Sequence, residues 1–220
     1  MFPSTKLASP GEYPFVFSGL IGKLEGVLTV PANANLQQVA LLGHPHSLQG
    51  GTMNNKVITT MARAFKELEI ASLRFNFRGV GNSEGSYDAG CGESEDMLAL
   101  MRLCQQEFDE DLNFIFAGFS FGSYVAYRAA AQARHELLIT IAPPVHHYNY
   151  QEFSPPEPWV IMQGEADEVV PFRVVEDFVN QFIPPLALHV FAETGHFFHG
   201  KLIELKSNLV EAVKTQVFKR

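Results

Sequence analysis

The stretch Gly118-Phe119-Ser120-Phe121-Gly122 decides the fold, because of the segments on its two sides. Residues 113–117 have the apolar and aromatic composition of a buried strand, and residues 124–131 are rich in alanine, the best helix former. A Gly-x-Ser-x-Gly pentapeptide between a strand and a helix is typical of a nucleophile elbow, a strained turn that exposes the serine hydroxyl. The glycines on each side of the serine leave room for the crowded backbone.

Strands and helices alternate on both sides of this pentapeptide. Short apolar segments predict buried strands at residues 39–42, 70–77, 113–117, 137–141, 159–162 and 186–191. Apolar residues at helical spacing predict further helices around residues 57–68, 93–108, 174–182 and 202–217. Before the first of these strands, residues 15–17 and 24–30 predict an antiparallel hairpin at a sheet edge. Apolar strands separated by amphipathic helices predict a three-layer α/β fold, with a mostly parallel sheet covered on both faces.

The size and charge of the chain exclude several function classes. A length of 220 residues fits one domain over residues 1–220. The net charge of -8, with no basic run, argues against a nucleic-acid partner. No apolar run approaches the roughly 18 residues of a membrane span, and the first residues lack the pattern of a secretory signal. With Cys91 and Cys104 read as reduced thiols, these features predict a cytoplasmic protein with no membrane partner.

A nucleophilic serine needs a base and an acid, and the sequence offers both just after predicted strands. In an open parallel sheet, ligands bind at the carboxyl ends of the strands. Asp167 follows the strand at 159–162, and His196 follows the strand at 186–191. The order Ser120, Asp167, His196 matches one of the known serine hydrolase orders. Other candidates are Glu165 and Asp177 for the acid, and His199, His146 and His147 for the base.

These three residue types supply what the chemistry requires. An unassisted serine hydroxyl is a poor nucleophile at neutral pH. His196 would remove the proton of Ser120, and Asp167 would fix the imidazole tautomer and stabilise the imidazolium. The three residues are therefore predicted to be the catalytic triad.

An oxyanion hole is expected beside Ser120. One donor is the backbone N–H of Phe121, and the second comes from the loop after the strand at 39–42. Because Pro45 has no N–H, that second donor is either His46 or Ser47. His44 and His46 could instead bind zinc, but no nearby acid completes a metal cluster, so no metal is expected.

Three segments resemble a compact bacterial subgroup of predicted hydrolases in the α/β-hydrolase superfamily. They are GHPHSLQGGTMNNKV at 43–57, LRFNFRGVGNSEG at 73–85 and GHFFHG at 195–200, and the wider resemblance extends from about residue 20 to the C-terminus. The resemblance implies a sheet of about eight strands, no cofactor, and the triad named above.

The sequence departs from the superfamily pattern at two positions. Pro45 stands where a glycine usually follows His44, which leaves the second oxyanion donor open. Asn76 stands where an aspartate commonly precedes Arg78 by two residues. Arg78 is expected to brace its loop through a buried ion pair or carbonyl contacts, so any acidic partner must come from elsewhere in the chain.

The hypothesis from sequence is a serine hydrolase that cleaves carboxylic esters or related small acyl substrates through an acyl-serine intermediate. Residues 145–158 are too few for a lid domain, which predicts an open cleft for small or medium acyl groups. The expected pocket residues are His44, Tyr148, Tyr150 and Phe153. Two alternatives are an acyl-peptide hydrolase or amidase with the same triad, and a non-catalytic binding protein with the hydrolase fold.

Overall fold

The computed structural model describes residues 9–218, apart from the side chain of Leu36. Its eight strands form one sheet in the order β1-β2-β4-β3-β5-β6-β7-β8. The strands are β1 (Gly11–Ser18), β2 (Lys23–Val30), β3 (Asn35–Gly43), β4 (Ile70–Phe75), β5 (Asn113–Phe119), β6 (Leu137–Ile141), β7 (Trp159–Gly164) and β8 (Ala187–Phe191). β1 and β2 pair antiparallel at one edge, β2 also pairs antiparallel with β4, and the remaining pairs are parallel.

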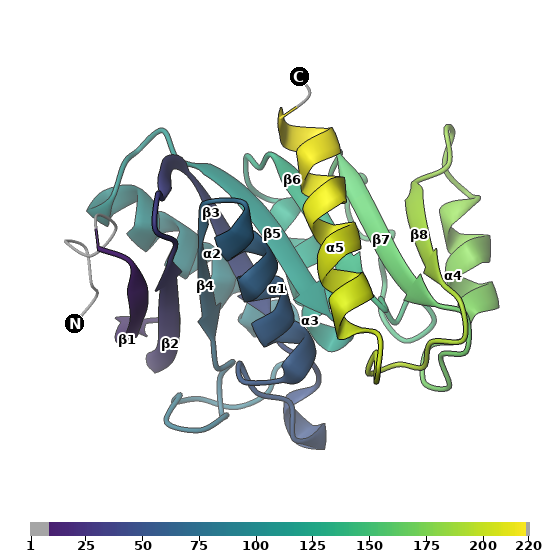
Figure 1. The fold of residues 1–220 in the computed structure, drawn as a ribbon. Coiled ribbons are helices and arrows are strands. Elements are labelled where there is room, and N and C mark those ends of the chain that lie inside the picture. Colours follow the sequence, from purple (N-terminus) through teal and green to yellow (C-terminus); the bar gives the residue numbers. More distant parts are fainter. Residues whose placement is uncertain (1–8, 219–220) are drawn as a thin grey trace.

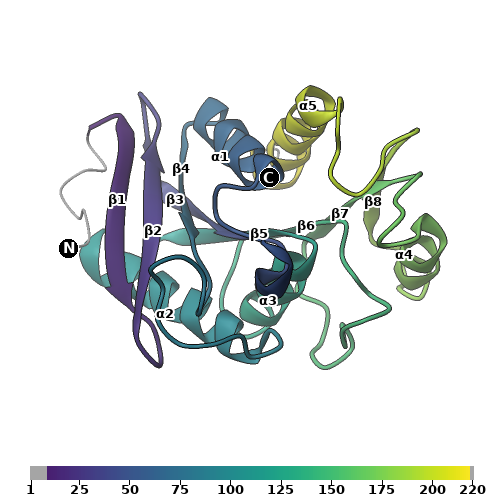
Figure 2. The same ribbon diagram turned by 90° about the horizontal axis from the view of Figure 1, so that it is seen from below.

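Helices cover both faces of the sheet (Figures 1 and 2). The five α-helices in residues 9–218 are α1 (Lys56–Glu67), α2 (Cys91–Glu107), α3 (Phe121–Ala130), α4 (Phe172–Val179) and α5 (Leu202–Val213). A short 3-10 turn, η2 (Ser47–Gln49), precedes α1, and a short π-helix, η3 (Lys214–Phe218), follows α5. Figure 2 shows α1 and α5 on one face, with α2, α3 and α4 on the other.

This layering produces two hydrophobic cores, one on each face of the sheet. Alternate side chains of a strand point to opposite faces, so a strand buried on both sides is apolar throughout. In β5, Phe114 and Phe116 join the core under α2 and α3, whereas Ile115 and Ala117 join the core under α1 and α5. The three-layer α/β prediction is confirmed.

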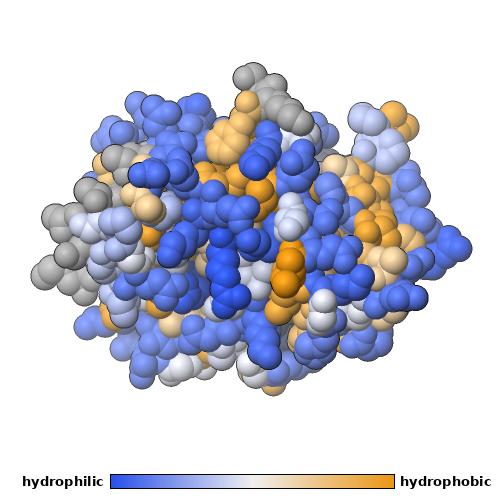
Figure 3. All heavy atoms as spheres, in the orientation of Figure 1, coloured by the Kyte–Doolittle hydropathy of each residue, from blue (hydrophilic) through white to orange (hydrophobic). Residues whose placement is uncertain are grey.

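The outer surface of the α1 and α5 layer is mostly hydrophilic. Figure 3 shows its hydrophobic side chains in small separate patches, which is the ordinary distribution on a globular protein. In residues 9–218, no helix is both long enough and apolar enough to cross a membrane.

Two of the element boundaries that differ from the sequence-based expectation have a clear local cause. β4 ends at Phe75, before Asn76, whose side chain accepts a hydrogen bond from the N–H of Met53 and donates one to Glu25. α2 begins at Cys91, because the carboxylate of Glu93 accepts hydrogen bonds from the N–H groups of Asp88 and Gly90 just before it. Polar side chains that bind local backbone groups thus set both boundaries.

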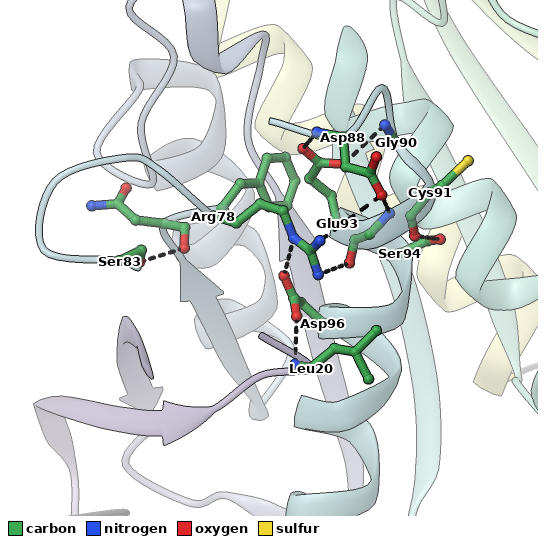
Figure 4. A network of polar contacts seen from close by, with 12 residues as sticks. Leu20, Arg78, Ser83, Asp88, Gly90, Cys91, Glu93, Ser94 and Asp96 are labelled. Atoms are coloured by element: carbon green, nitrogen blue, oxygen red, sulfur yellow. Dashed lines mark hydrogen bonds and ion pairs between the residues drawn. The ribbon is translucent and has the colours of Figure 1, made fainter. Parts of the chain in front are cut away.

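Arg78 braces the loop between β4 and α2, as expected. Its Nε donates to the Asp96 carboxylate at 2.7 Å, and its Nη2 donates to the Gly92 carbonyl at 2.8 Å. Asp96 also accepts the N–H of Leu20 at 2.9 Å, so a single carboxylate ties this loop to the β1–β2 turn (Figure 4). The acid that the sequence lacks at Asn76 is therefore supplied by α2.

Candidate active site

Ser120 lies at the turn between β5 and α3, in a conformation that few non-glycine residues adopt. Its backbone angles are φ 54° and ψ −124°. The surrounding structure holds this strained turn in place. The N–H of Ser120 donates to the carbonyl oxygen of Ile141 at 2.8 Å, and the hydroxyl of Ser123 donates to the carbonyl groups of Gly118 and Ile141 at 2.8 and 2.9 Å.

The glycines of the pentapeptide are required by space. A Cβ atom on Gly118 would clash with the backbone of Gly122, and a Cβ atom on Gly122 would clash with the carbonyl group of Gly43. The missing side chain at Gly118 therefore lets the turn close, and the missing side chain at Gly122 lets it pack against β3.

Ser120, His196 and Asp167 form a continuous hydrogen-bonded series. Nε2 of His196 lies 3.0 Å from Oγ of Ser120, and Nδ1 lies 2.9 Å from Oδ2 and 3.1 Å from Oδ1 of Asp167. His196 is 2% exposed and Asp167 6% exposed, whereas Ser120 is partly open to solvent. This geometry allows the serine proton to pass to the imidazole.

The Asp167 carboxylate determines the tautomer of His196. A carboxylate accepts hydrogen bonds, so Nδ1 carries the proton and Nε2 is left to accept the serine hydroxyl. The carboxylate also accepts the N–H groups of Val169 and Val170 at 2.9 and 2.7 Å, and the Gln163 side-chain amide at 3.1 Å. The buried charge is therefore well supplied with donors.

The His196 loop has its own anchor. The carboxylate of Glu168 accepts the backbone N–H of His196 at 3.2 Å. The imidazole ring contacts the rings of Phe119 and Phe197, with centroids 5.0 and 5.1 Å away. These contacts restrict the ring to the orientation that reaches Ser120.

The other acids and histidines that the sequence offered lie outside this series. Glu165 and Asp177 are exposed, one in the turn after β7 and the other on α4. His146 and His147 are exposed and lie against each other, with ring centroids 3.8 Å apart. His199 is also exposed, and its ring stacks on Phe197. Among residues 9–218, no cluster of three or more metal-ligating side chains occurs.

A cavity of about 130 Å³ opens at Ser120. Its lining includes Ser120, His196, Pro45, His46, Gln49, Asn55, Val169 and Phe197. Val169 and Phe197 are each 44% exposed and form an apolar wall, while Gln49 and Asn55 contribute side-chain amides. A larger groove of about 810 Å³ between β1 and α2 contains none of these residues.

The expected oxyanion donors differ in how well they are placed beside this cavity. Phe121 is the first residue of α3, so no helical carbonyl accepts its N–H. His46 lines the cavity and packs its ring on Phe121, with centroids 5.1 Å apart, whereas Ser47 is not among the lining residues. Partial burial lowers the pKa of His46, opposed by the nearby Glu93 carboxylate. His46 is therefore better placed than Ser47 to supply the second N–H.

The four expected pocket residues do not line this cavity. His44 is fully buried, where its Nδ1–H donates to the carbonyl of Pro45 and its Nε2 accepts the N–H of Phe77. Burial lowers the pKa of His44 to about 4, so its ring is neutral and structural. Tyr148 and Tyr150 border a separate cavity of about 250 Å³. Phe153, in the β6–β7 connection, packs against Tyr127 of α3, and its carbonyl accepts the Tyr127 hydroxyl.

The sequence interpretation missed Gln163, Glu168, Val169 and Phe197. A signal existed for Gln163, because it is a polar residue near the end of an otherwise apolar strand, four positions before Asp167. Phe197 directly follows His196 and could have been suspected for that reason. No sequence pattern distinguishes Val169 from an ordinary core valine.

Comparisons with known proteins agree with this fold. The chain matches no family model. It is 36% identical over 171 residues to an uncharacterized protein of Rickettsia prowazekii (strain Madrid E), a match that covers 75% of this chain and 71% of that relative. It is similar to the structure of an α/β serine hydrolase homologue from Coxiella burnetii, with 43% identity, a TM-score of 0.87, and 91% of this chain and 97% of that chain covered.

A second solved structure is equally informative. It comes from Xanthomonas campestris and is described as a member of the α/β serine hydrolases without a lid. The two chains are 37% identical, with a TM-score of 0.90, and the match covers 98% of this chain and 96% of that one. In this chain the whole connection from β6 to β7 lies in the described residues and contains no helix or strand.

Proposed function

The chain belongs to the α/β serine hydrolases, and from this premise we propose that it cleaves small carboxylic esters through an acyl intermediate on Ser120. The observation that carries this proposal is the hydrogen-bonded series from Ser120 through His196 to Asp167, with 3.0 and 2.9 Å at its two shortest links. The family premise supports hydrolysis, and the series supplies a nucleophile, a base and an orienting acid.

In the proposed first half-reaction, Oγ of Ser120 attacks the ester carbonyl carbon while Nε2 of His196 takes the hydroxyl proton. The carbonyl oxygen becomes an oxyanion, which the N–H groups of Phe121 and His46 would stabilise. Collapse of this intermediate breaks the bond to the alcohol oxygen, which receives the proton from His196. The alcohol leaves, and the acyl group remains on Ser120.

The second half-reaction uses the same groups. A water molecule gives a proton to Nε2 of His196 and attacks the acyl carbon. The second tetrahedral intermediate collapses, the proton returns to Oγ of Ser120, and the carboxylic acid is released. In both halves Asp167 stabilises the imidazolium that forms.

The cavity at Ser120 supports a small acyl group as substrate. Its volume of about 130 Å³ is similar to that of a cavity that holds a benzene-sized molecule, about 150 Å³. The side chains of Val169 and Phe197 offer apolar surface to an acyl chain, and the connection after β6 adds no cover over it. Longer chains would have to extend into solvent, where they gain little from burial.

The test is a panel of p-nitrophenyl esters of increasing acyl length, assayed beside aminoacyl p-nitroanilides. We expect hydrolysis of the acetyl to butyryl esters, a decline with longer chains, and little activity on the anilides. Ser120→Ala is the control for background hydrolysis. A preference for the anilides would replace the esterase assignment with a peptidase or amidase. Absence of turnover on every compound would favour a binding protein with the hydrolase fold.

A further inference from the structure

Gln163 is a fully buried amide in direct contact with Asp167. It is the second-last residue of β7 and is 0% exposed. Its Nε2 donates to Oδ2 of Asp167 at 3.1 Å and to the carbonyl oxygen of Val170 at 2.9 Å, with the Gly164 carbonyl further away at 3.4 Å. Gln163 therefore connects the end of β7 to both Asp167 and Val170 in the turn that follows.

The orientation of this amide is determined by its surroundings. An amide nitrogen has two protons, and here one faces Asp167 and the other faces Val170. Exchanging the nitrogen and oxygen atoms would place an acceptor against two other acceptors. In the orientation observed, Oε1 of Gln163 is buried and has no partner among the described residues. Unpartnered buried acceptors are uncommon, and each one calls for an explanation.

We propose that Gln163 is a positioning residue, which holds the Asp167 carboxylate in its hydrogen bond with the His196 ring and moderates its charge. The inference rests on the function proposed above. Oδ1 of Asp167 accepts the N–H groups of Val169 and Val170, whereas the donors to Oδ2 within residues 9–218 are Gln163 and His196. Gln163 thus fixes the rotation of the carboxylate at the atom nearest to Nδ1.

The amide also affects the electrostatics of the base. The positive end of its N–H dipole points at the carboxylate and weakens the negative potential at His196. Removing that dipole would strengthen the attraction of Asp167 for the imidazolium. The acid limb of the rate profile would then move to higher pH. The other charged or titratable groups near the pair are Glu168, at the His196 backbone, and His146, near Asp167.

The principal test is Gln163→Met, which keeps the chain length and removes both donors. We expect kcat to fall by about tenfold with KM changed by less than about twofold, because substrate contacts are untouched. The midpoint of the acid limb of kcat/KM should rise by about half a pH unit. Gln38→Met is a matched control. Gln38 lies on β3, away from the site, and it is also a buried glutamine that donates to a carboxylate, that of Glu136.

A second variant separates positioning from simple filling of space. Gln163→Glu keeps the shape of glutamine, and its buried carboxyl group beside Asp167 would be protonated, so it offers one O–H donor. Positioning by hydrogen-bond donation predicts that kcat decreases in the order wild type, Gln163→Glu, Gln163→Met. If Gln163 only filled space, Gln163→Met would be as active as the wild type, and that result would overturn the proposal.

A measurement independent of turnover keeps this inference separable from the proposed function. Proton NMR of the hydrogen-bonded Nδ1 proton of His196 reports its contact with Asp167 whether or not the protein hydrolyses esters. We expect its downfield resonance to shift in Gln163→Met and to be unchanged in Gln38→Met. A folded Gln163→Met protein with an unchanged resonance would contradict the role of Gln163, even if Ser120 were shown to be catalytic.

Discussion

Nε2 of His196 lies 3.0 Å from Oγ of Ser120, although the two residues are 76 positions apart in the sequence. The register of the parallel strands explains this approach. Phe119 at the end of β5 pairs with Ile141, Ile141 pairs with Met162 on β7, and Met162 pairs with His189 on β8. The strands therefore end together, and the loops that follow β5, β7 and β8 bring Ser120, Asp167 and His196 to one edge of the sheet.

The role of Asp167 is tested against its neighbour Glu165. Asp167→Asn should reduce kcat by about 10⁴-fold, because an amide in place of the carboxylate favours the wrong imidazole tautomer. Glu165→Gln should leave kcat within about twofold, since this side chain is exposed. Steady-state kinetics on a short-chain p-nitrophenyl ester measure both. A larger loss in Glu165→Gln than in Asp167→Asn would transfer the role to Glu165.

Phe197 is expected to limit acyl length. Phe197→Ala removes part of the apolar wall beside Ser120, so the ratio of kcat/KM for octanoyl over butyryl esters should rise several-fold. The matched control is Phe218→Ala, at a phenylalanine that is similarly exposed but lies in η3, after α5. If both variants keep the wild-type chain-length profile, Phe197 does not determine specificity.

The Arg78–Asp96 ion pair is predicted to be important for stability. Both side chains are almost fully buried, at 4% and 1% exposure. Asp96→Ala removes the acceptor of Arg78 Nε and of the Leu20 N–H and leaves a buried charge without its main partner, so the free energy of unfolding should fall by about 3–5 kcal/mol. Urea denaturation followed by circular dichroism measures this change.

An exposed ion pair provides the comparison for Asp96→Ala. Glu204→Ala removes the partner of Lys201 at the surface, and should cost less than about 1 kcal/mol. Equal losses in the two variants would show that burial of the Arg78–Asp96 pair has no special effect.

His44 makes the stability of the protein depend on pH. Burial lowers the pKa of His44 to about 4, whereas a histidine in an unfolded chain titrates near about 6.5. Between these values the unfolded chain binds a proton that the folded protein excludes, so stability falls as pH falls. From pH 7 to pH 5 this single group should remove about 2 kcal/mol from the free energy of unfolding.

The comparison with His44→Asn isolates that contribution. Other histidines titrate equally in both proteins, so the difference in pH dependence belongs to position 44. We expect the free energy of unfolding of His44→Asn to fall by about 2 kcal/mol less between pH 7 and pH 5. Parallel curves for the two proteins would show that His44 takes up a proton equally well in the folded and unfolded states.

The sequence was sufficient for the fold and for the candidate nucleophile, base and acid. Apolar strands that end in polar turns indicate the parallel sheet and the edge at which its loops meet. The pattern around Ser120 then identifies the strand that the candidate nucleophile follows. The same reasoning predicted an acidic partner for Arg78 from elsewhere in the chain. It did not identify that partner as Asp96, because the contact joins a loop to a helix.

The pocket could not be predicted in the same way. Which side chains face Ser120 depends on the path of the loop from Pro45 to Asn55 and on the turn that exposes Val169. His44 stands next to that loop in sequence, yet it points into the core, because Phe77 and Pro45 bind both of its nitrogen atoms. Aromatic residues after β6 suggested a pocket wall, but their rings pack mainly on α3.

Active-site labelling directly tests whether Ser120 is an activated nucleophile. The folded protein is treated with a fluorophosphonate, which reacts with a serine that an adjacent base activates, and the modified peptide is identified by mass spectrometry. We expect a single adduct on Ser120, lost in Ser120→Ala and after unfolding. An unlabelled native protein, or an adduct on another serine with Ser120 intact, would contradict it.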